Sequence, residues 1–249
     1  QTLPKTDKEN IKKYYKSKNY LSHNNNKTFF SFLYLVVKRL NFYFKYRVLK
    51  KASSHKNRLL DFGSGNAYFV SKLNQNGGQA YAYDPFYNQV SNKTVEQQKV
   101  LVNKSDLIAS KFKTITMWHS LEHVFSYKNT LSTVFDVLDY KGCLIVACPN
   151  YKSFDAVYYK KFWAGYDVPR HYWHFSPKGL IDVMSDSGFE YISKKPMYFD
   201  AFYVSMLSEQ YKKSKLWFIK GFLIGLASNL VSFFKGNASS YVYVFKKRF

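Results

Sequence analysis

The stretch RLLDFGSGNAYFVSKLNQNGGQAYAYDP, residues Arg58 to Pro85, decides the fold of this chain. It begins with a short apolar strand ending at Asp61, passes through a glycine-rich turn, and continues as a helix-like run from Ala67 to Leu73. A second strand, 79–83, closes on Asp84. This order predicts one βαβ unit, whose turn and helix N-terminus present backbone N–H groups that a nucleotide-type ligand can approach closely.

The acid after the second strand makes the ligand type more specific. A carboxylate at the position of Asp84 can accept both hydroxyls of a ribose. A nicotinamide enzyme would favour the G-x-G-x-x-G spacing, but Tyr68 stands where the third glycine would be. The stretch therefore favours a nucleoside ligand other than a dinucleotide.

Strand-like and helix-like segments alternate from Arg58 onward, which predicts an α/β fold with a parallel, doubly wound sheet. Helices are expected over 127–138 and from Ser176-Pro177 to about Gly188, the latter with proline at its first position. A helical insertion at about 200–234 precedes the last strand. The expected strands are 58–61, 79–83, 99–103, 114–118, 143–148, 190–197 and 241–247.

The N-terminal part, 1–51, is expected to be a helical cover over a domain spanning 52–249. Its helix, from Phe29 to about Lys51, favours a packing role over one edge of the sheet, with a lid over the ligand as the alternative. The aromatic patch Tyr14 to His23 fits either role. The apolar spacing is helical and comprises Phe29, Phe32, Leu33, Val36, Val37 and Leu40, and basic residues at the remaining positions include Lys38, Arg39, Lys45, Arg47 and Lys50.

The chain is strongly basic, with 38 Lys and Arg against 16 Asp and Glu and a formal charge of +22 over 249 residues. Only five of the basic residues are arginine, whereas nucleic-acid readers rely on arginine for bidentate contacts. The surplus of lysine, with abundant Asn, Tyr and Phe, also resembles AT-rich coding bias. Nucleic acid, an anionic membrane surface and an anionic substrate remain alternative partners.

Cys143 and Cys148 lie five residues apart in one apolar strand. Because side chains on a strand alternate faces, the two thiols point in opposite directions and cannot pair. We expect reduced core thiols in a cytoplasmic protein.

The most apolar run, Leu216 to Phe234, is 19 residues long and approaches the length that spans a membrane. Lys220, Ser228, Asn229 and Ser232 interrupt it. A core or cap helix is favoured, and a helix in peripheral contact with a membrane or a true span are the alternatives. The expected packing stripe comprises Leu216, Ile219, Leu223, Leu226 and Leu230.

Five motifs together carry a resemblance to a known family: LLDFGSGNA, YAYDP, ITMWHSLEHV, GCLIVACPN and DVPRHYWHFSPKGL. They resemble class I S-adenosylmethionine-dependent methyltransferases and are similar to the branch of ubiquinone-biosynthesis O-methyltransferases and their bacterial relatives. The resemblance covers about residues 14–200 and the last strand. It implies a Rossmann-like, seven-stranded sheet whose last strand is antiparallel, S-adenosyl-L-methionine as cofactor and S-adenosyl-L-homocysteine as product.

The resemblance also implies which residues hold the cofactor. Asp61 would orient its amino-acid end, Gly63 and Gly65, with Ser64 between them, would let the backbone pass beneath it, and Asp84 would bind the ribose. Ala67 replaces a glycine of the family pattern, and its methyl is expected to tighten the pocket.

Three further residues extend the implied cofactor site. Asp106 would bind the edge of the adenine, after the third strand. Trp118 and His119 would contact the cofactor from the far side, at the tip of the fourth strand.

The sequence His119-x-x-Glu122-His123 also spells the H-x-x-E-H arrangement of one class of zinc peptidases. That chemistry needs a helix and a further ligand, whereas the motif here starts at a strand end, so we disfavour it and assign no metal ligands. Glu122 and His123 either cap the following helix and hydrogen-bond locally, or face the substrate.

His171 and His174 lie in the loop 151–175, which is expected over the mouth of the site. His174, or His123, is the predicted general base, because an imidazole with a pKa near 6.5 suits proton abstraction at neutral pH. The alternatives are hydrogen-bonded supports, or a divalent-ion site shared with Glu122. The aromatic residues of this loop either form a wall against a planar or apolar acceptor or pack in the ordinary way. They are Phe162, Trp163, Tyr166, Tyr172 and Trp173.

We therefore expect O-methylation of a small or lipid-like hydroxylated acceptor. One alternative is an RNA methyltransferase that uses the basic surface. The other is a non-catalytic binding protein that retains the fold, for which Ala67 is the motif-level indication.

Overall fold

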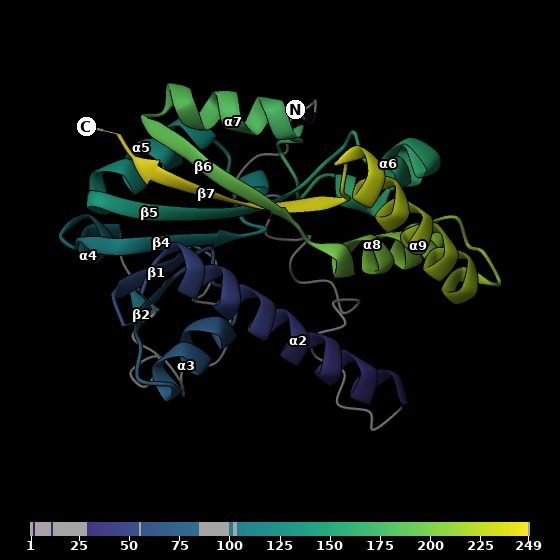
Figure 1. The fold of residues 1–249 in the computed structure, drawn as a ribbon, viewed down its shortest axis with the longest axis horizontal. Helices are drawn as coiled ribbons and strands as arrows, with labels where there is room; N and C mark the ends of the chain where they lie inside the picture. Colours follow the sequence, from purple (N-terminus) through teal and green to yellow (C-terminus); the bar gives the residue numbers. More distant parts are fainter. Residues whose placement is uncertain are drawn as a thin grey trace.

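The computed structural model describes residues 2, 11, 29–54, 56–84, 100–101 and 104–248, with backbone only for 29–38 and 100–101. Figure 1 shows a central sheet with helices on both faces and a helical lobe at one end. The expected α/β fold with a mixed sheet is confirmed. The aromatic patch 14–23 lies outside the described residues.

The sheet has seven strands in the order β3-β2-β1-β4-β5-β7-β6. β7 runs antiparallel to both of its neighbours, β5 and β6, whereas the pairs among β1 to β5 are parallel. The strands are β1 (Arg58–Phe62), β2 (Gln79–Tyr83), β3 (Val100–Leu101), β4 (Phe112–Trp118), β5 (Leu138–Pro149), β6 (Phe189–Pro196) and β7 (Ser240–Lys247).

Helices cover the two faces of this sheet (Figure 1). On one face Leu107, Leu131 and Leu180 pack against the strands, and on the other face Leu49 and Phe69 do so. The described helices are α2 (Phe29–Ala52), α3 (Tyr68–Gln75), α4 (Lys104–Ile108), α5 (Tyr127–Val137), α6 (Phe154–Tyr159), α7 (Pro177–Asp186), α8 (Tyr198–Tyr211) and α9 (Trp217–Lys235). The short 3₁₀ helices are η4 (Leu121–His123), η5 (Lys160–Phe162) and η6 (Ala164–Tyr166).

Local signals explain several boundaries. Ser176 caps α7 by accepting a hydrogen bond from the Gly179 N–H at 3.1 Å, and Pro177 occupies the first helical position, as predicted. The fifth strand begins at Leu138, before the predicted Cys143. Leu138 pairs with Phe112 of β4, and a register shift separates this pair from the next one, Thr114 with Cys143.

The two cysteines are free and buried. Cys143 packs on the α2 and α3 face of the sheet and Cys148 on the opposite face, which confirms that they point in opposite directions.

The described half of α2 packs on the sheet beside α3, as the packing alternative predicts. Of the predicted apolar residues of this helix, only Leu40 lies among those whose side chains the structure describes, and it is 43% exposed. In the described part of the helix Phe42, Val48 and Leu49 are buried, and the ring centroids of Phe42 and Phe69 are 5.9 Å apart. The core contact of this part is therefore made by residues that follow the predicted stripe.

The insertion before the last strand is a pair of helices, α8 and α9, that pack against each other beside α6 (Figure 1). The stripe of Leu216, Ile219, Leu223, Leu226 and Leu230 was expected to pack, and this was wrong, because each of these side chains is more than 40% exposed. The buried face of α9 consists of Gly221, Gly225, Ser228 and Ser232.

Candidate active site

Carboxylates gather at the edge of the sheet where the parallel strands end. Asp61 is the second-last residue of β1, Asp84 follows β2 directly, and Glu122 follows β4 in η4. Because these three strands are parallel, their carboxyl ends meet at one edge, which is where ligands of open α/β sheets bind. In a chain of net charge +22, this edge is locally acidic and complementary to a cation.

The glycine turn after β1 requires its glycines. Gly63 has φ +78°, and a Cβ added there would lie 2.4 Å from the Cβ of Ser120, so no side chain fits. Gly65 has φ +53°, and its N–H donates to Asp84 Oδ2 at 2.8 Å, while a Cβ on Gly65 would meet nothing within 4 Å. The turn thus leaves open backbone beside the acid predicted to bind the ribose.

Ala67 adopts the left-handed conformation, with φ 53°, at the N-cap of α3. This conformation costs an L-residue about 1–2 kcal/mol, which explains why glycine suits the position. The methyl is fully buried in the core on the α2 and α3 face. It therefore does not tighten the ligand site as expected, and the departure from glycine strains the backbone instead.

Asp61 is 3% exposed and accepts a hydrogen bond from Thr116 Oγ1 at 2.7 Å. Burial raises the pKa of its carboxyl to about 6, even though Lys45 and Thr116 act in the opposite direction. The buried carboxylate of Asp61 therefore begins to take up a proton just below neutral pH.

Lys45 reaches this carboxylate from α2. Its Nζ lies 4.9 Å from the ring centroid of Trp118 and 5.8 Å from that of Phe69, a cation–π arrangement. Burial lowers the pKa of Lys45, and the charges of Asp61 and Asp200 oppose that change. The sequence places Lys45 only among the basic residues outside the apolar stripe, and the structure directs its side chain into the site.

Three buried polar atoms at this edge make no hydrogen bond among the described residues: Ser64 Oγ, Trp118 Nε1 and Glu122 Oε1, the last of which lies 3.4 Å from His119 Nδ1 in an ion pair. Buried polar groups are normally satisfied, so a ligand that supplies partners is the simplest explanation. With the carboxylates of Asp61 and Asp84 and the open backbone at Gly65, they match the charge and polar groups of the cofactor that the sequence implies. The residues present therefore fit S-adenosylmethionine.

Asp106 is exposed in the first turn of α4, five residues beyond β3. The segment 85–99, which leads into β3, lies outside the described residues. Its assignment to the adenine edge therefore stays a prediction.

His119 joins α8 to the strand ends. It has φ 52° at the tip of β4, and its imidazole lies between two carboxylates, with Nε2 3.0 Å from Asp200 Oδ2 and Nδ1 3.4 Å from Glu122 Oε1. Burial opposes a charge on the ring, but these carboxylates outweigh it and raise the pKa of His119 to about 10. His119 is therefore an imidazolium at neutral pH and cannot act as a base there.

Glu122 is 1% exposed, and although burial opposes its charge, the bond to His119 and the histidine charges around it lower its pKa to about 2. It was expected either to cap the next helix or to face the substrate. The capping role was wrong, because Ser126 caps α5 by accepting from the Asn129 N–H at 3.4 Å. The backbone carbonyl of Glu122 accepts from the N–H groups of Tyr172 and Trp173, which fixes the loop 151–175 to η4.

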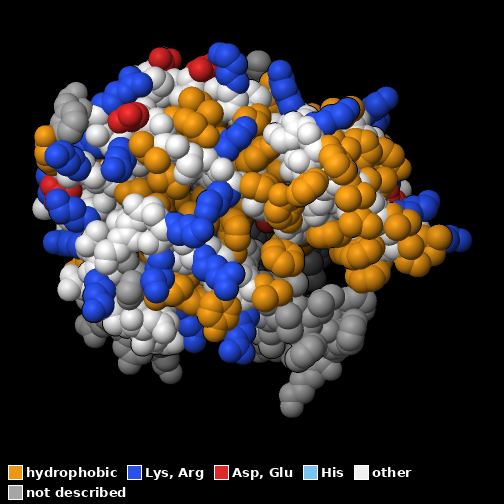
Figure 2. All heavy atoms as spheres, in the orientation of Figure 1, with side chains coloured by type: hydrophobic (Ala, Val, Ile, Leu, Met, Phe, Trp, Pro, Cys, Tyr) orange, Lys and Arg blue, Asp and Glu red, His pale blue; other side chains and the backbone are white. Residues whose placement is uncertain are grey.

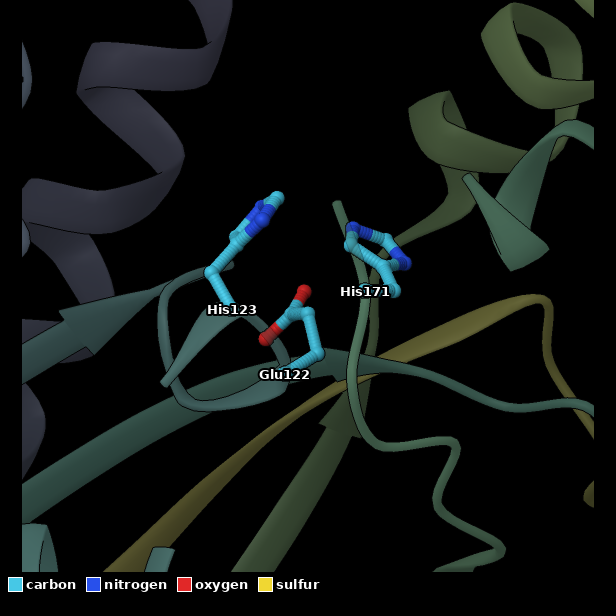
Figure 3. Close-up of side chains that lie close together, drawn as sticks. All are labelled: Glu122, His123 and His171. Carbon is cyan, nitrogen blue, oxygen red and sulfur yellow. The ribbon is translucent and has the colours of Figure 1, made fainter. Parts of the chain in front are cut away.

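Glu122, His123 and His171 lie together, with one donor atom from each within 4.8 Å of the others (Figure 3). The two rings meet edge to face with centroids 4.4 Å apart. His123 Nδ1 lies 3.1 Å from the Arg170 carbonyl and His171 Nδ1 lies 2.9 Å from the Gly165 carbonyl. Two imidazoles and a carboxylate are ligand types that suit a divalent transition metal, so this trio could hold one.

Burial and the neighbouring His123 lower the pKa of His171 to about 4, so this ring is neutral at pH 7. His171 is 7% exposed and tied to the loop at Nδ1, which suits a support.

His174 lies farther back, with its ring centroid 6.3 Å from that of His171 and its Nε2 3.0 Å from the Tyr166 carbonyl. Burial lowers its pKa. The structure therefore places His123 and His171 beside Glu122, and His174 adjoins His171 outside this group.

The aromatic loop is largely packed. Trp163 and Tyr172 are each 2% exposed, Trp163 Nε1 donates to Asp155 Oδ2 at 2.7 Å, and Trp173 Nε1 donates to the Val124 carbonyl at 2.8 Å. The hollow beside Trp163 and His174 has no room for a water molecule. Packing, the second of the two expected roles, accounts for most of this wall.

Sequence reasoning missed Lys45 and Asp200 as residues of this site. Both reach it from helices that flank the sheet, and their contacts span 16 or more residues along the chain. No local motif marks either residue. The acid-glycine signal, in contrast, is contained within one βαβ unit, and it is the basis on which Asp61, Gly63, Gly65 and Asp84 are predicted.

Comparisons with known proteins support this reading of the edge. The profile of a family described as the methyltransferase domain matches residues 32–194. No curated protein sequence matches the chain.

Solved structures share the fold at low sequence identity. The magnesium protoporphyrin IX methyltransferase of Synechocystis, with bound S-adenosylhomocysteine, is 14% identical, with 97% of this chain and 100% of that chain covered and a TM-score of 0.59. An S-adenosylmethionine-dependent methyltransferase of Thermotoga maritima is 15% identical, with 87% and 93% covered and a TM-score of 0.56. Phosphoethanolamine N-methyltransferase 2 of Haemonchus contortus, with S-adenosylmethionine, is 14% identical, with 82% and 52% covered and a TM-score of 0.53.

Proposed function

We propose that this chain, which belongs to the methyltransferase domain family, transfers the methyl group of S-adenosylmethionine to a hydroxyl of a small or lipid-like acceptor. The class I fold and the S-adenosylmethionine-dependent enzyme class follow from the family and its structural neighbours. The similarity to the ubiquinone-biosynthesis O-methyltransferases motivates the choice of a hydroxyl. The observation that carries the proposal is the acidic, glycine-lined edge with unpartnered Ser64 Oγ and Trp118 Nε1 among the described residues.

When bound, the cofactor supplies a methyl group activated by a sulfonium. This chain would hold it through Asp61 at the amino-acid end, Asp84 at the ribose, and the Gly63-Ser64-Gly65 turn. The ionised Glu122 adds negative potential at the same edge, which favours a cationic ligand. Trp118 supplies an aromatic face that already accepts a cation from Lys45.

His123 is the general base in this proposal. Donation from Nδ1–H to the Arg170 carbonyl would place the basic lone pair of the neutral ring on Nε2. The hydroxyl proton would pass to this nitrogen as the hydroxyl oxygen bonds to the methyl carbon and the carbon–sulfur bond breaks. His174 is the second candidate, because its Nε2 is engaged by the Tyr166 carbonyl and Nδ1 is left as acceptor.

The apolar lobe beside the site supports an acceptor with a lipid-like part. Tyr198 and Phe199, next to Asp200 on α8, are 44% and 48% exposed. Facing the site itself, the described charged groups are mainly carboxylates, which gives no specific support to an RNA acceptor.

The proposal is tested by incubating the protein with a cell extract and methyl-deuterated cofactor, followed by mass analysis of the solvent-extracted, aqueous and RNA fractions. We expect labelled hydroxylated compounds in the solvent-extracted fraction, and loss of that label in a His123→Gln variant that still binds S-adenosylhomocysteine. Label in RNA would favour the RNA alternative. Absence of both label and cofactor binding would favour the non-catalytic alternative.

A further inference from the structure

The helical lobe, residues 154–162 and 198–235, carries an extensive apolar exterior. Figure 2 shows hydrophobic side chains covering this end of the molecule, with Lys and Arg around them. Large exposed apolar patches on soluble proteins mark interaction sites. The side chains that are 38% or more exposed are Val157, Tyr158, Phe162, Tyr198, Phe199, Tyr203, Tyr211, Leu216, Phe218, Ile219, Phe222, Leu223, Leu226, Leu230, Phe233 and Phe234.

The large apolar side chains of α9 face outward, which is the opposite of a surface helix in a soluble protein. Its mean hydropathy is 1.5 over an 18-residue window, of which only 22% is buried. Its small face is buried on α8, where a Cβ on Gly221 would lie 2.5 Å from Met206 Cα and a Cβ on Gly225 would lie 2.8 Å from Phe202 Cα. The helices approach too closely for larger residues there, so the large apolar side chains of α9 point outward.

The inward face is specific, which shows that the outward face is not simply an undocked core. The buried carboxylate of Asp155 on α6 accepts three hydrogen bonds of 2.7 Å, from Trp163 Nε1, Ser228 Oγ and Ser239 Oγ. Asn229 Nδ2 donates to the Tyr198 carbonyl at 2.9 Å. Ser228 and Asn229 thus direct their hydrogen bonds into the lobe, whereas the outer surface of α9 is apolar apart from Lys220 and Lys235.

The charges exposed on the lobe are positive. Its two acids on α8, Asp200 and Glu209, are turned inward, with side chains 15% and 2% exposed. The exposed lysines are Lys160, Lys161, Lys212, Lys213, Lys215, Lys220 and Lys235. Two copies of such a surface would repel each other, whereas an anionic lipid surface complements both its charge and its apolar area.

The pair of helices α8 and α9 begins and ends at the same sheet. α8 follows β6, and α9 leads into β7, which is paired between β5 and β6. If α9 crossed a bilayer, α8 would have to cross it in the opposite direction, and its 14 residues are fewer than the roughly 20 that a span requires. We propose that the helical lobe docks on an anionic lipid membrane, with α9 lying in the interface and its flanking lysines at the headgroups.

The docked surface leads to the methyl-transfer site. α8 begins with Tyr198 and Phe199, and the Oδ2 atom of the next residue, Asp200, lies 3.0 Å from His119 Nε2. A membrane-resident acceptor would therefore enter the site from the lobe. This last consequence rests on the proposed function, whereas the docking does not.

Docking is tested by flotation of the full chain with vesicles of phosphatidylcholine alone or mixed with phosphatidylglycerol. We expect binding to the mixed vesicles that weakens with salt. Phe233→Ser combined with Phe234→Ser should reduce partitioning by at least about tenfold. The control Ile108→Ser combined with Tyr140→Ser, two exposed apolar residues outside the lobe, should leave it unchanged.

A set of lysine substitutions distinguishes the contribution of the lobe's lysines to binding from the contribution of the total charge. Lys213, Lys215 and Lys220 changed together to Gln should lower partitioning about a hundredfold at low salt, because each lysine near an anionic surface contributes on the order of 1 kcal/mol. The matched triple change Lys56, Lys104 and Lys128 to Gln, which removes the same charge elsewhere, should have a much smaller effect.

Absence of binding to the mixed vesicles would overturn the proposal, and so would equal losses in the lobe and control variants. A stable dimer by light scattering that the Phe233→Ser, Phe234→Ser variant abolishes would assign the surface to a second copy instead. Calorimetry with S-adenosylhomocysteine on the same samples reports the cofactor site separately, so failure of docking and failure of the proposed function are distinguishable.

Discussion

At the scale of single residues, Asp61 is the most informative group of the cofactor site. Its carboxyl is buried and has a pKa of about 6, raised from 3.8. A ligand amino group requires the ionised form, so binding below this pKa must displace a proton from Asp61. We expect the affinity for S-adenosylhomocysteine, measured by calorimetry, to be steady above about pH 7 and to fall by up to about tenfold per pH unit below pH 6.

The Asp61→Asn variant provides the control for this titration. It should bind more weakly at pH 7, and its affinity should no longer change between pH 7 and pH 5. An affinity of the native protein that stays constant over the same range would contradict the assignment of Asp61.

His119 provides a second titration. Its pKa is about 10 in the folded chain against an ordinary value of 6.5, because the carboxylates of Asp200 and Glu122 overcome burial. Since the folded value is the higher, the stability that this charge contributes is fully present below pH 6.5 and is lost as the pH rises through about 10. In Asp200→Asn the pKa of His119 should fall, so its ring should begin to titrate near neutral pH.

Nitrogen-detected NMR of the His119 ring measures this directly. In the native protein the ring should remain doubly protonated at neutral pH, whereas the Asp200→Asn ring should show a proton loss within the range explored. A native ring that titrates near its ordinary value would show that the contact with Asp200 does not form in solution.

At the scale of elements, the lobe depends on the Asp155 carboxylate, which ties α6 to Trp163 between η5 and η6, to α9, and to the residue that precedes β7. Asp155→Ala removes the acceptor of three buried donors, on Trp163, Ser228 and Ser239. We expect a loss of roughly 3 kcal/mol or more in the stability of this region, because unsatisfied buried donors each cost about 1–3 kcal/mol. Hydrogen exchange of α9 and the Tm report the effect.

An exposed aspartate on a helix serves as the comparison. Asp136→Ala on α5 should change neither the exchange of α9 nor the Tm. If Asp155→Ala behaves in the same way, the lobe is held by its helix contacts alone.

The elements differ in how well the sequence predicts them. The strands and α7 could be predicted, because apolar runs, turn residues and the Ser176-Pro177 cap are local signals. α9 was predicted as a helix with the wrong buried face, because apolar periodicity assumes that the core attracts the large side chains. In the structure close helix packing selects Gly221 and Gly225 for the interior, and the leucines are left outside.

At the scale of the whole molecule, the same distinction between local and distant signals applies to the site. Asp61, Gly63, Gly65 and Asp84 come from one continuous βαβ unit. Lys45 and Asp200 reach the site through tertiary packing of α2 and α8, which no local pattern records. The loop contact to η4, which brings His171 beside His123, is likewise not recorded in any local pattern, and the choice between His174 and His123 as base stays a prediction.

Acidic groups and apolar surface lie at different places on the molecule. Carboxylates gather where the parallel strands end, although the chain carries a formal charge of +22. The lobe next to them is apolar and basic on its outside (Figure 2). This division suits a cationic cofactor at the sheet edge and an acceptor that enters from the lobe.

The central claim is that the edge formed by Asp61, the glycine turn and Asp84 holds the cofactor, and calorimetry with S-adenosylhomocysteine tests it most directly. The native chain should bind, and Asp84→Ala should bind more weakly by about 1–3 kcal/mol, which is about 5-fold to 150-fold in Kd. Asp186→Ala, an exposed aspartate on α7, should match the native chain. Equal affinity of Asp84→Ala and the native chain, or no binding by the native chain, would contradict the account.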